Sequence, residues 1–386
     1  MMHPDPKSRR PRMVVAGLVL AGLSSAITTT ASAGADEPVE QKTVQARQRL
    51  FGSGNVDPST GQVRRDRAVF SWVTVSTVAA SLGGQVVLLD SYIHKVEDRP
   101  NYVPATVQDL IDIDPKYIFI GHGHADHAEN SGIIAVETGA TVVGTPTHCD
   151  EAQRQADSYA PGAPPIHCIT AVSNQSAPGE VINELPLLGS RGCVTALKHL
   201  HSDVESPDPE HDPNPVFLVP NPGPMLMHPP GPGITGGLFT NPGDEGSSVL
   251  YQFRIGQFTA TWHDTVGPLK ERAPAVLSKM RQLSPTDLQL GAILGTNVVT
   301  NGLRDPAMYV GALRPKVFAP LHHDFLTEYG SGDELQSTFE REEQVQNNAP
   351  DVRWLTDPYD YVEPGMLTFE LDDPRWAQPR AEAGCQ

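Results

Sequence analysis

Basic side chains are scarce in this chain of 386 residues. It carries 28 Lys and Arg against 46 Asp and Glu, so its formal net charge is −18. Nucleic acids and anionic membranes attract basic surfaces, and this charge therefore argues against binding to either as the main task. An acidic surface suits a chain that attracts divalent cations, although solubility alone explains it equally well.

Cysteine is also rare. The chain has four, at Cys149, Cys168, Cys193 and Cys385. No two of them have the C-x-x-C spacing of a thiolate metal site. Cys149 and Cys168 are the nearest pair, so in an oxidising compartment we expect one disulfide and free thiols. An extra metal site at His148–Cys149 and His167–Cys168 is the less favoured alternative.

A run long enough to span a membrane comfortably is lacking as well. The apolar "MVVAGLVLAGLSSAI" follows the basic "KSRRPR" and precedes the small-residue site "ASA" at 31–33. This is the pattern of an export signal and not of a transmembrane helix. We therefore expect residues 1–33 to be a signal peptide and the protein to be exported, to the periplasm, the cell surface or the medium. Arg9 and Arg10 leave open a twin-arginine signal, which exports folded proteins, beside the general secretory one.

The remaining chain divides by composition. Residues 34–65 are polar and rich in turn residues, which indicates an N-terminal arm. Residues 66–370 are expected to form the folded domain, with a Pro/Gly-rich insertion at about 202–246, and residues 371–386 a C-terminal tail. Two β-rich hairpins, "SWVTVSTVAASLGGQVVLLDSYI" and "SSVLYQFRIGQFTATWHDT", each precede strand and helix patterns. This predicts an α/β fold with a pseudo-duplicated arrangement.

The densest chemical signal is "HGHADH", which follows the buried strand pattern "PKYIFIG". His122 and His124 lie two residues apart, so on an extended segment they point the same way. Asp126 and His127 follow on the turn into a helix. One short stretch can thus offer two ligands to each of two adjacent metal ions, if other loops complete the set.

Further ligand types stand where other predicted strands end. They are Asp90, His199 or His201, Asp264, and His322 or His323. In this order, from about Trp72 to about Tyr329, the five motifs resemble the metallo-β-lactamase superfamily of binuclear metallohydrolases. The final "APLHH" resembles the P-x-H of its ascorbate-phosphate lactonase-like branch. The resemblance implies an αββα four-layer sandwich, with two mainly antiparallel mixed sheets face to face and metals at one sheet edge.

The resemblance also implies a ligand set for two divalent metal ions. The first ion would be held by His122, His124 and His201, and the second by Asp126, His127 and His322, with Asp264 bridging both. His199 remains an alternative to His201, and His323 to His322. Asp90 is expected to orient loop backbone. His263 stands where the family more often has Gly, which leaves open a role as a pocket donor.

What the resemblance implies for function is metal-dependent hydrolysis of a small-molecule lactone, amide or phosphoester. A hydroxide bridging two ions, with zinc expected and iron or manganese open, would attack the substrate, and Asp126 would accept or pass on the proton. Met225, Met227 and Phe239 in the insertion indicate either an apolar lid, which would suit an acylated substrate, or an insertion packed on the core or at an oligomer interface. The alternatives are a non-catalytic metal-binding protein on the same scaffold, or a β-lactamase or phospholipase-like member. The oligomeric state is not predicted.

Overall fold

The structure is a computed structural model that describes residues 40–93, 105–203, 208, 247–295, 301–323, 332–355 and 364–376. These residues belong to one unit, Val39–Gln386. A separate unit, Met1–Pro38, contains the expected signal peptide and lies outside the described residues. Most of the expected insertion, including its apolar residues Met225, Met227 and Phe239, also lies outside them, as does most of the C-terminal tail.

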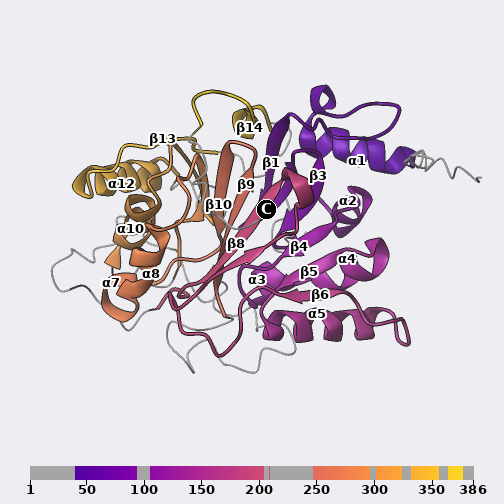
Figure 1. Cartoon of the computed structure of the whole chain (residues 1–386), viewed down its shortest axis with the longest axis horizontal. Helices are drawn as coiled ribbons and strands as arrows, with labels where there is room; N and C mark the ends of the chain where they lie inside the picture. Colours follow the sequence, from indigo (N-terminus) through magenta and orange to yellow (C-terminus); the bar gives the residue numbers. More distant parts are fainter. Residues whose placement is uncertain are drawn as a thin grey trace, which may run out of the picture. The chain divides into compact units, whose positions relative to one another are not determined.

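Two seven-stranded sheets form the centre of the fold (Figure 1). The first has the order β14 (Thr368–Glu370), β1 (Arg67–Thr74), β2 (Thr77–Leu82), β3 (Gln85–Leu89), β4 (Tyr117–Phe119), β5 (Thr141–Gly144), β6 (Cys168–Thr170). The second has the order β13 (Asp351–Val352), β12 (Val317–Leu321), β11 (Leu288–Ala292), β10 (Phe258–His263), β9 (Val249–Ile255), β8 (Gly192–Lys198), β7 (Ile182–Leu185).

The two sheets repeat one pattern of pairing. Three antiparallel pairs are followed by three parallel pairs when the first sheet is followed from β14 and the second from β7. The shared pattern agrees with the pseudo-duplication expected from the sequence. The expectation of mainly antiparallel sheets is wrong, because each half adds strands through helical crossovers, and such connections join parallel strands.

Helices cover the outer face of each sheet (Figure 1). Over the first lie α1 (Gln41–Phe51), α2 (Val107–Asp112), α4 (Ser131–Thr138) and α5 (Pro146–Tyr159), which share a buried cluster with its strands. Over the second lie α7 (Leu269–Arg272), α8 (Pro274–Met280), α10 (Arg304–Leu313) and α12 (Gly332–Val345). The inner faces meet in one core, where the ring centroids of Phe119 on β4 and Phe253 on β9 are 5.0 Å apart. The αββα sandwich is confirmed.

Part of the expected N-terminal arm packs into this sandwich. Helix α1 buries Leu50 and Phe51 completely, in the same cluster as Leu88 of β3. Val56 and Val63 then form a short antiparallel bridge. These apolar residues are spaced among polar ones, and such spacing places them on one buried face of a helix or turn.

A disulfide joins Cys149 on α5 to Cys168 at the start of β6, as expected, with a Cα–Cα distance of 5.8 Å. Since both sulfurs are bonded to each other, the alternative metal site at this pair is not formed. Cys193 is also disulfide-bonded, and none of the described cysteines is free. The expectation of a free thiol is therefore wrong for Cys193, because spacing along the sequence does not reveal which distant segments meet. Cys385 lies outside the described residues.

No helix in the described ranges is long and apolar enough to cross a membrane.

Candidate metal centre

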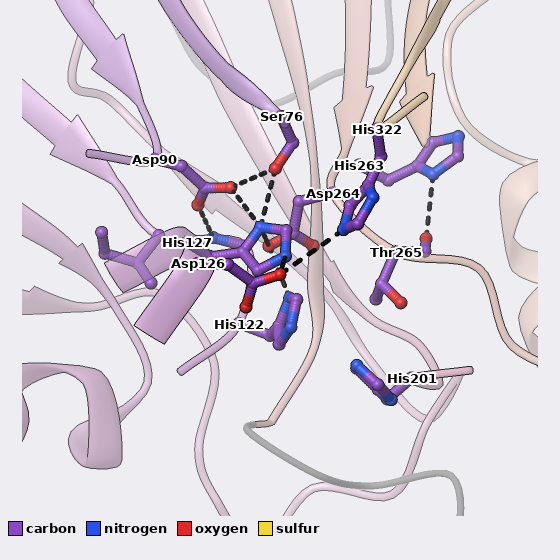
Figure 2. A network of polar contacts seen from close by, with 12 residues as sticks. Ser76, Asp90, His122, Asp126, His127, His201, His263, Asp264, Thr265 and His322 are labelled. Carbon is purple, nitrogen blue, oxygen red and sulfur yellow. Dashed lines mark hydrogen bonds and ion pairs between the residues drawn. The ribbon is translucent and has the colours of Figure 1, made fainter. Parts of the chain in front are cut away.

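Strands from both sheets end at one common site. Asp90 follows β3, His122 follows β4, Asp264 follows β10 and His322 follows β12. His201 lies three residues beyond β8, and His124, Asp126 and His127 occupy the cap and body of the short helix α3 (Ala125–Ala128). Because carboxyl ends of neighbouring parallel strands meet at the same sheet edge, side chains far apart in sequence converge there (Figure 2).

One group of side chains consists of His122, His124 and His201. A ligand atom from each lies within 4.8 Å of the others, and the three pairs of ring centroids are 4.6–4.8 Å apart. All three rings are buried. Burial and the neighbouring imidazoles hold the pKa of His122 well below its usual range and lower that of His124 to about 3. Neutral imidazole is the form that binds a metal, so this group is prepared for a cation.

A second group lies beside the first and consists of Asp126, His127 and His322. One Asp126 oxygen, Oδ2, is 3.4 Å from His127 Nε2 and 3.7 Å from His322 Nε2. Ligand atoms 2.0–2.2 Å from one tetrahedral ion lie about 3.4 Å apart, which is close to both distances. Desolvation opposes ionisation of Asp126 only in part, because the side chain is 41% exposed, and the imidazoles of His127 and His322 hold its pKa well below its usual value, so the carboxylate is ionised.

Asp264 lies between the two groups. Its Oδ2 is 2.7 Å from His122 Nδ1 and 3.4 Å from His127 Nδ1, so it touches one histidine of each. Burial, with the nearby Asp90, raises the pKa of Asp264 well above its usual value. Gly121 makes the approach possible, since a Cβ there would lie 2.1 Å from Asp264 Cγ.

Asp90 lies beside His127 and Ser76 at the edge of the site (Figure 2). Its Oδ1 accepts a hydrogen bond from the Gly121 N–H at 3.0 Å, so it orients loop backbone as the sequence indicated. Its Oδ2 lies 2.8 Å from His127 Nδ1 and accepts from the Ser76 hydroxyl at 2.7 Å. Asp90, with φ 56°, Val75, with φ 47°, and His322, with φ 63°, adopt left-handed backbone. Such conformations cost about 1–3 kcal/mol each and gather at functional sites.

The structure separates the two histidine pairs that the sequence left open. His201 lies in the first group, whereas His199 Nδ1 is 2.9 Å from the Tyr309 hydroxyl, outside the ligand groups. His322 faces Asp126, whereas the His323 ring stacks on Trp354 at 4.6 Å and meets the edge of Trp72 at 4.8 Å. That the grouped residues bind metal stays a prediction.

His263 is buried and does not act as a donor in the pocket. Its Nδ1–H donates to the Thr265 carbonyl at 3.0 Å, and its Nε2 accepts from the Gln289 amide at 2.9 Å. Burial lowers the pKa of His263 to about 4, so the ring is neutral. Gly291 makes room for it, because a Cβ there would lie 2.5 Å from His263 Nε2. The ring therefore holds the turn that carries Asp264.

The chemistry of the cluster fits a pair of divalent cations. His122 Nε2, Asp264 Oδ1 and His322 Nδ1 are buried without a hydrogen-bond partner among the described residues. Buried polar atoms are rarely left in this state unless an ion or water completes them. Imidazole and carboxylate ligands together suit zinc, iron or manganese.

All seven residues predicted from the sequence to bind metal lie in or between the two groups. The surrounding Ser76, Trp72, Trp354, Tyr309 and Gln289 carried no recognisable signal in the sequence.

Comparison with known proteins gives likenesses of structure only. No protein-family model and no curated protein matches the chain. Among solved structures it is similar to Igni18, a metallo hydrolase from Ignicoccus hospitalis, with 14% identity over 76% of this chain and 96% of that one and a TM-score of 0.45. It is similar to Tm1679, a metal-dependent hydrolase of the β-lactamase superfamily, with 11% identity over 75% and 95% of the chains and a TM-score of 0.38. The superfamily that the motifs resemble is also found among these neighbours.

A third similar structure is CmlA, a diiron β-hydroxylase from Streptomyces venezuelae. The identity is 12% over 76% of this chain, the TM-score is 0.45, and the chain spans about half of CmlA, 54%. Two activities thus occur among the neighbours, and neither is transferred to this chain by the likeness.

Proposed function

We propose that the protein is an exported, binuclear metal-dependent hydrolase acting on a small-molecule lactone, amide or phosphoester. The observation that carries this proposal is the adjacency of two complete ligand groups, with Asp264 in contact with both. When bound, two divalent ions, with zinc as the expected metal, make water a nucleophile at neutral pH and polarise the substrate oxygen.

Asp126 is the residue we propose to accept and pass on a proton. Its side chain is 41% exposed and that of His322 is 17% exposed, whereas the rings of His122 and His127 are 1% exposed. Substrate therefore reaches the site from the side of Asp126 and His322. The ionised Asp126 carboxylate has one oxygen, Oδ2, directed at His127 and His322, and its other oxygen is available to the attacking water.

Export is supported by two independent features. The first 33 residues have the composition of a signal peptide, and the described cysteines are disulfide-bonded. Structural disulfides persist in oxidising compartments and are rare in the cytosol. We therefore expect the protein to be recovered outside the cytoplasm, with a mature N-terminus near Gly34.

The proposal is tested by measuring metal content and turnover together. Elemental analysis of the mature protein should find two metal equivalents per chain, and lactone, amide and phosphoester substrates, each with short and long acyl chains, should be screened for hydrolysis. Asp126→Ala should reduce turnover at least about 100-fold, as loss of a proton acceptor does, and should lower metal content. Asp150→Ala removes an exposed carboxylate of α5 and should change neither.

Two outcomes would overturn the proposal. Metal content near zero after loading would mean that the ligand groups do not bind ions. Two equivalents of metal without turnover on any of the three substrate classes would indicate the non-catalytic metal-binding alternative.

A further inference from the structure

The turn between β1 and β2, formed by Val75 and Ser76, contacts both histidines of the second ligand group. Its Ser76 hydroxyl is 2.7 Å from His127 Nδ1, and its Val75 carbonyl accepts a hydrogen bond from the His322 N–H at 2.7 Å. The first group is oriented by other parts of the chain. His201 Nδ1 is held by the Ser202 carbonyl at 2.8 Å, and His122 Nδ1 by Asp264.

Asp90 and Ser76 together determine which nitrogen of His127 is available to a metal. The Asp90 carboxylate can only accept, and the single hydroxyl proton of Ser76 is donated to Asp90 Oδ2, so the Ser76 oxygen also can only accept from His127. His127 Nδ1 therefore carries a hydrogen, shared between Ser76 and Asp90 (Figure 2). In the neutral ring that binds a metal, the lone pair is therefore on Nε2, the atom that lies 3.4 Å from Asp126. Partners behind a ligating histidine fix its tautomer and orientation in this way.

Val75 determines the direction of His322. Positive φ is unusual for any residue with a side chain and most unfavourable for a β-branched one, yet Val75 has φ 47° and His322 has φ 63°. The hydrogen bond between them links the two strained positions. The Val75 carbonyl also accepts from Trp72 Nε1 at 2.8 Å, and the Trp72 ring contacts His323, the residue after His322.

We infer that the β1–β2 turn is a positioning device for the second ion, and that Ser76 is a positioning residue that sets the affinity of this ion and not of the first. This inference rests on the proposed function, because it requires two ions. Ser76 touches His127 and Asp90 and does not need to contact substrate.

The experiment is a stepwise zinc titration of the metal-free protein against a chromophoric chelator, at fixed pH. The wild type should bind two equivalents in two steps, of which His322→Ala weakens one and His201→Ala the other. Ser76→Ala should weaken the His322 step by about 10–100-fold, the usual effect of removing such a partner, and leave the His201 step unchanged. Ser81→Ala is the matched control, since this serine is buried on β2 of the same hairpin and its hydroxyl has no hydrogen-bond partner within the described ranges.

Equal weakening of both steps, or of neither, by Ser76→Ala would overturn the inference, because a general loss of structure does not distinguish the two ions. A wild type that fails to bind two equivalents would instead overturn the proposed function. If circular dichroism shows that Ser76→Ala does not fold, Trp72→Phe examines the same turn by removing the indole N–H from the Val75 carbonyl. It should weaken the same step, and an unchanged His322 step would contradict the inference.

Discussion

At the scale of the residue, burial decides the charge of the side chains in the site. It also decides the charge of Glu343, which lies on α12 and outside the ligand groups. Glu343 is 4% exposed, so its carboxyl group is removed from water. Burial raises the pKa of Glu343 to about 8, with Glu342 adding to the effect and Asn348 opposing it. The folded protein therefore binds a proton here that the unfolded chain releases near pH 4.5.

This shift predicts a loss of stability with rising pH. Because the pKa is raised on folding, the contribution of Glu343 is fully present below about pH 4.5 and is lost as the pH rises to about 8. Glu343→Gln should raise the free energy of unfolding at pH 8 by up to about 4 kcal/mol and change it little at pH 4.5. Urea unfolding of metal-free protein at both values measures this. Glu340→Gln, exposed on the same helix, should have no effect, and an equal gain at both pH values would count against the assignment.

At the scale of the element, the turn after β10 holds Asp264 through His263. His263→Phe keeps the ring but leaves the Thr265 carbonyl and the Gln289 amide without their buried partner. It should lower the free energy of unfolding by about 2–4 kcal/mol. Since Asp264 touches a histidine of each group, both zinc steps should also weaken, in contrast to Ser76→Ala.

The matched control is His167→Phe, an exposed position before β6, which should change the free energy of unfolding by less than about 0.5 kcal/mol. A His263→Phe protein with unchanged urea unfolding and unchanged zinc binding would show that the turn does not depend on this ring.

The elements also show what the sequence could and could not predict. Strands that end at residues of the site were predictable, because apolar runs stop abruptly at Asp90, His122, Asp264 and His322. The turn at Val75–Ser76 was not, since "WVTVSTVA" contains no Gly, Pro, Asn or Asp and reads as one strand. The short edge strands β6 and β7 are only partly buried and left no clear pattern.

The sequence could not decide between the two histidines of each pair for a similar reason. His199 and His201 lie two residues apart and share one face of an extended segment, so their spacing does not distinguish them. What separates them is Tyr309, 110 residues further along the chain, whose hydroxyl contacts His199. For His322 and His323 the deciding contacts come from Trp72 and Trp354.

At the scale of the whole molecule, the ligand groups connect the two sheets. His122, His124, Asp126 and His127 follow β4 of the first sheet, whereas His201, Asp264 and His322 follow strands of the second. Bound ions would therefore act as links between the two halves of the sandwich. Binding that occurs only in the folded state stabilises it in proportion to RT ln(1 + [L]/Kd).

Removal of metal should accordingly lower the melting temperature of the whole sandwich. With free metal about 1,000-fold above its Kd, each site contributes about 4 kcal/mol to the free energy of unfolding. Differential scanning calorimetry with and without a chelator measures the difference. His322→Ala should show a smaller shift, because it retains the first ligand group, and a wild type that melts identically in both conditions would contradict the link between the sheets.

The spread of these ligands along the chain has a consequence for how the protein acquires its metal. The first group is incomplete until His201 has been synthesised, and the second until His322 has. No stretch of the chain can hold both ions before the two sheets have come together. A chain that crosses a membrane unfolded would therefore arrive without its ions and take them from the pool outside, whereas one exported in the folded state would carry ions selected in the cytoplasm. The route of export would thus decide which metal occupies the site.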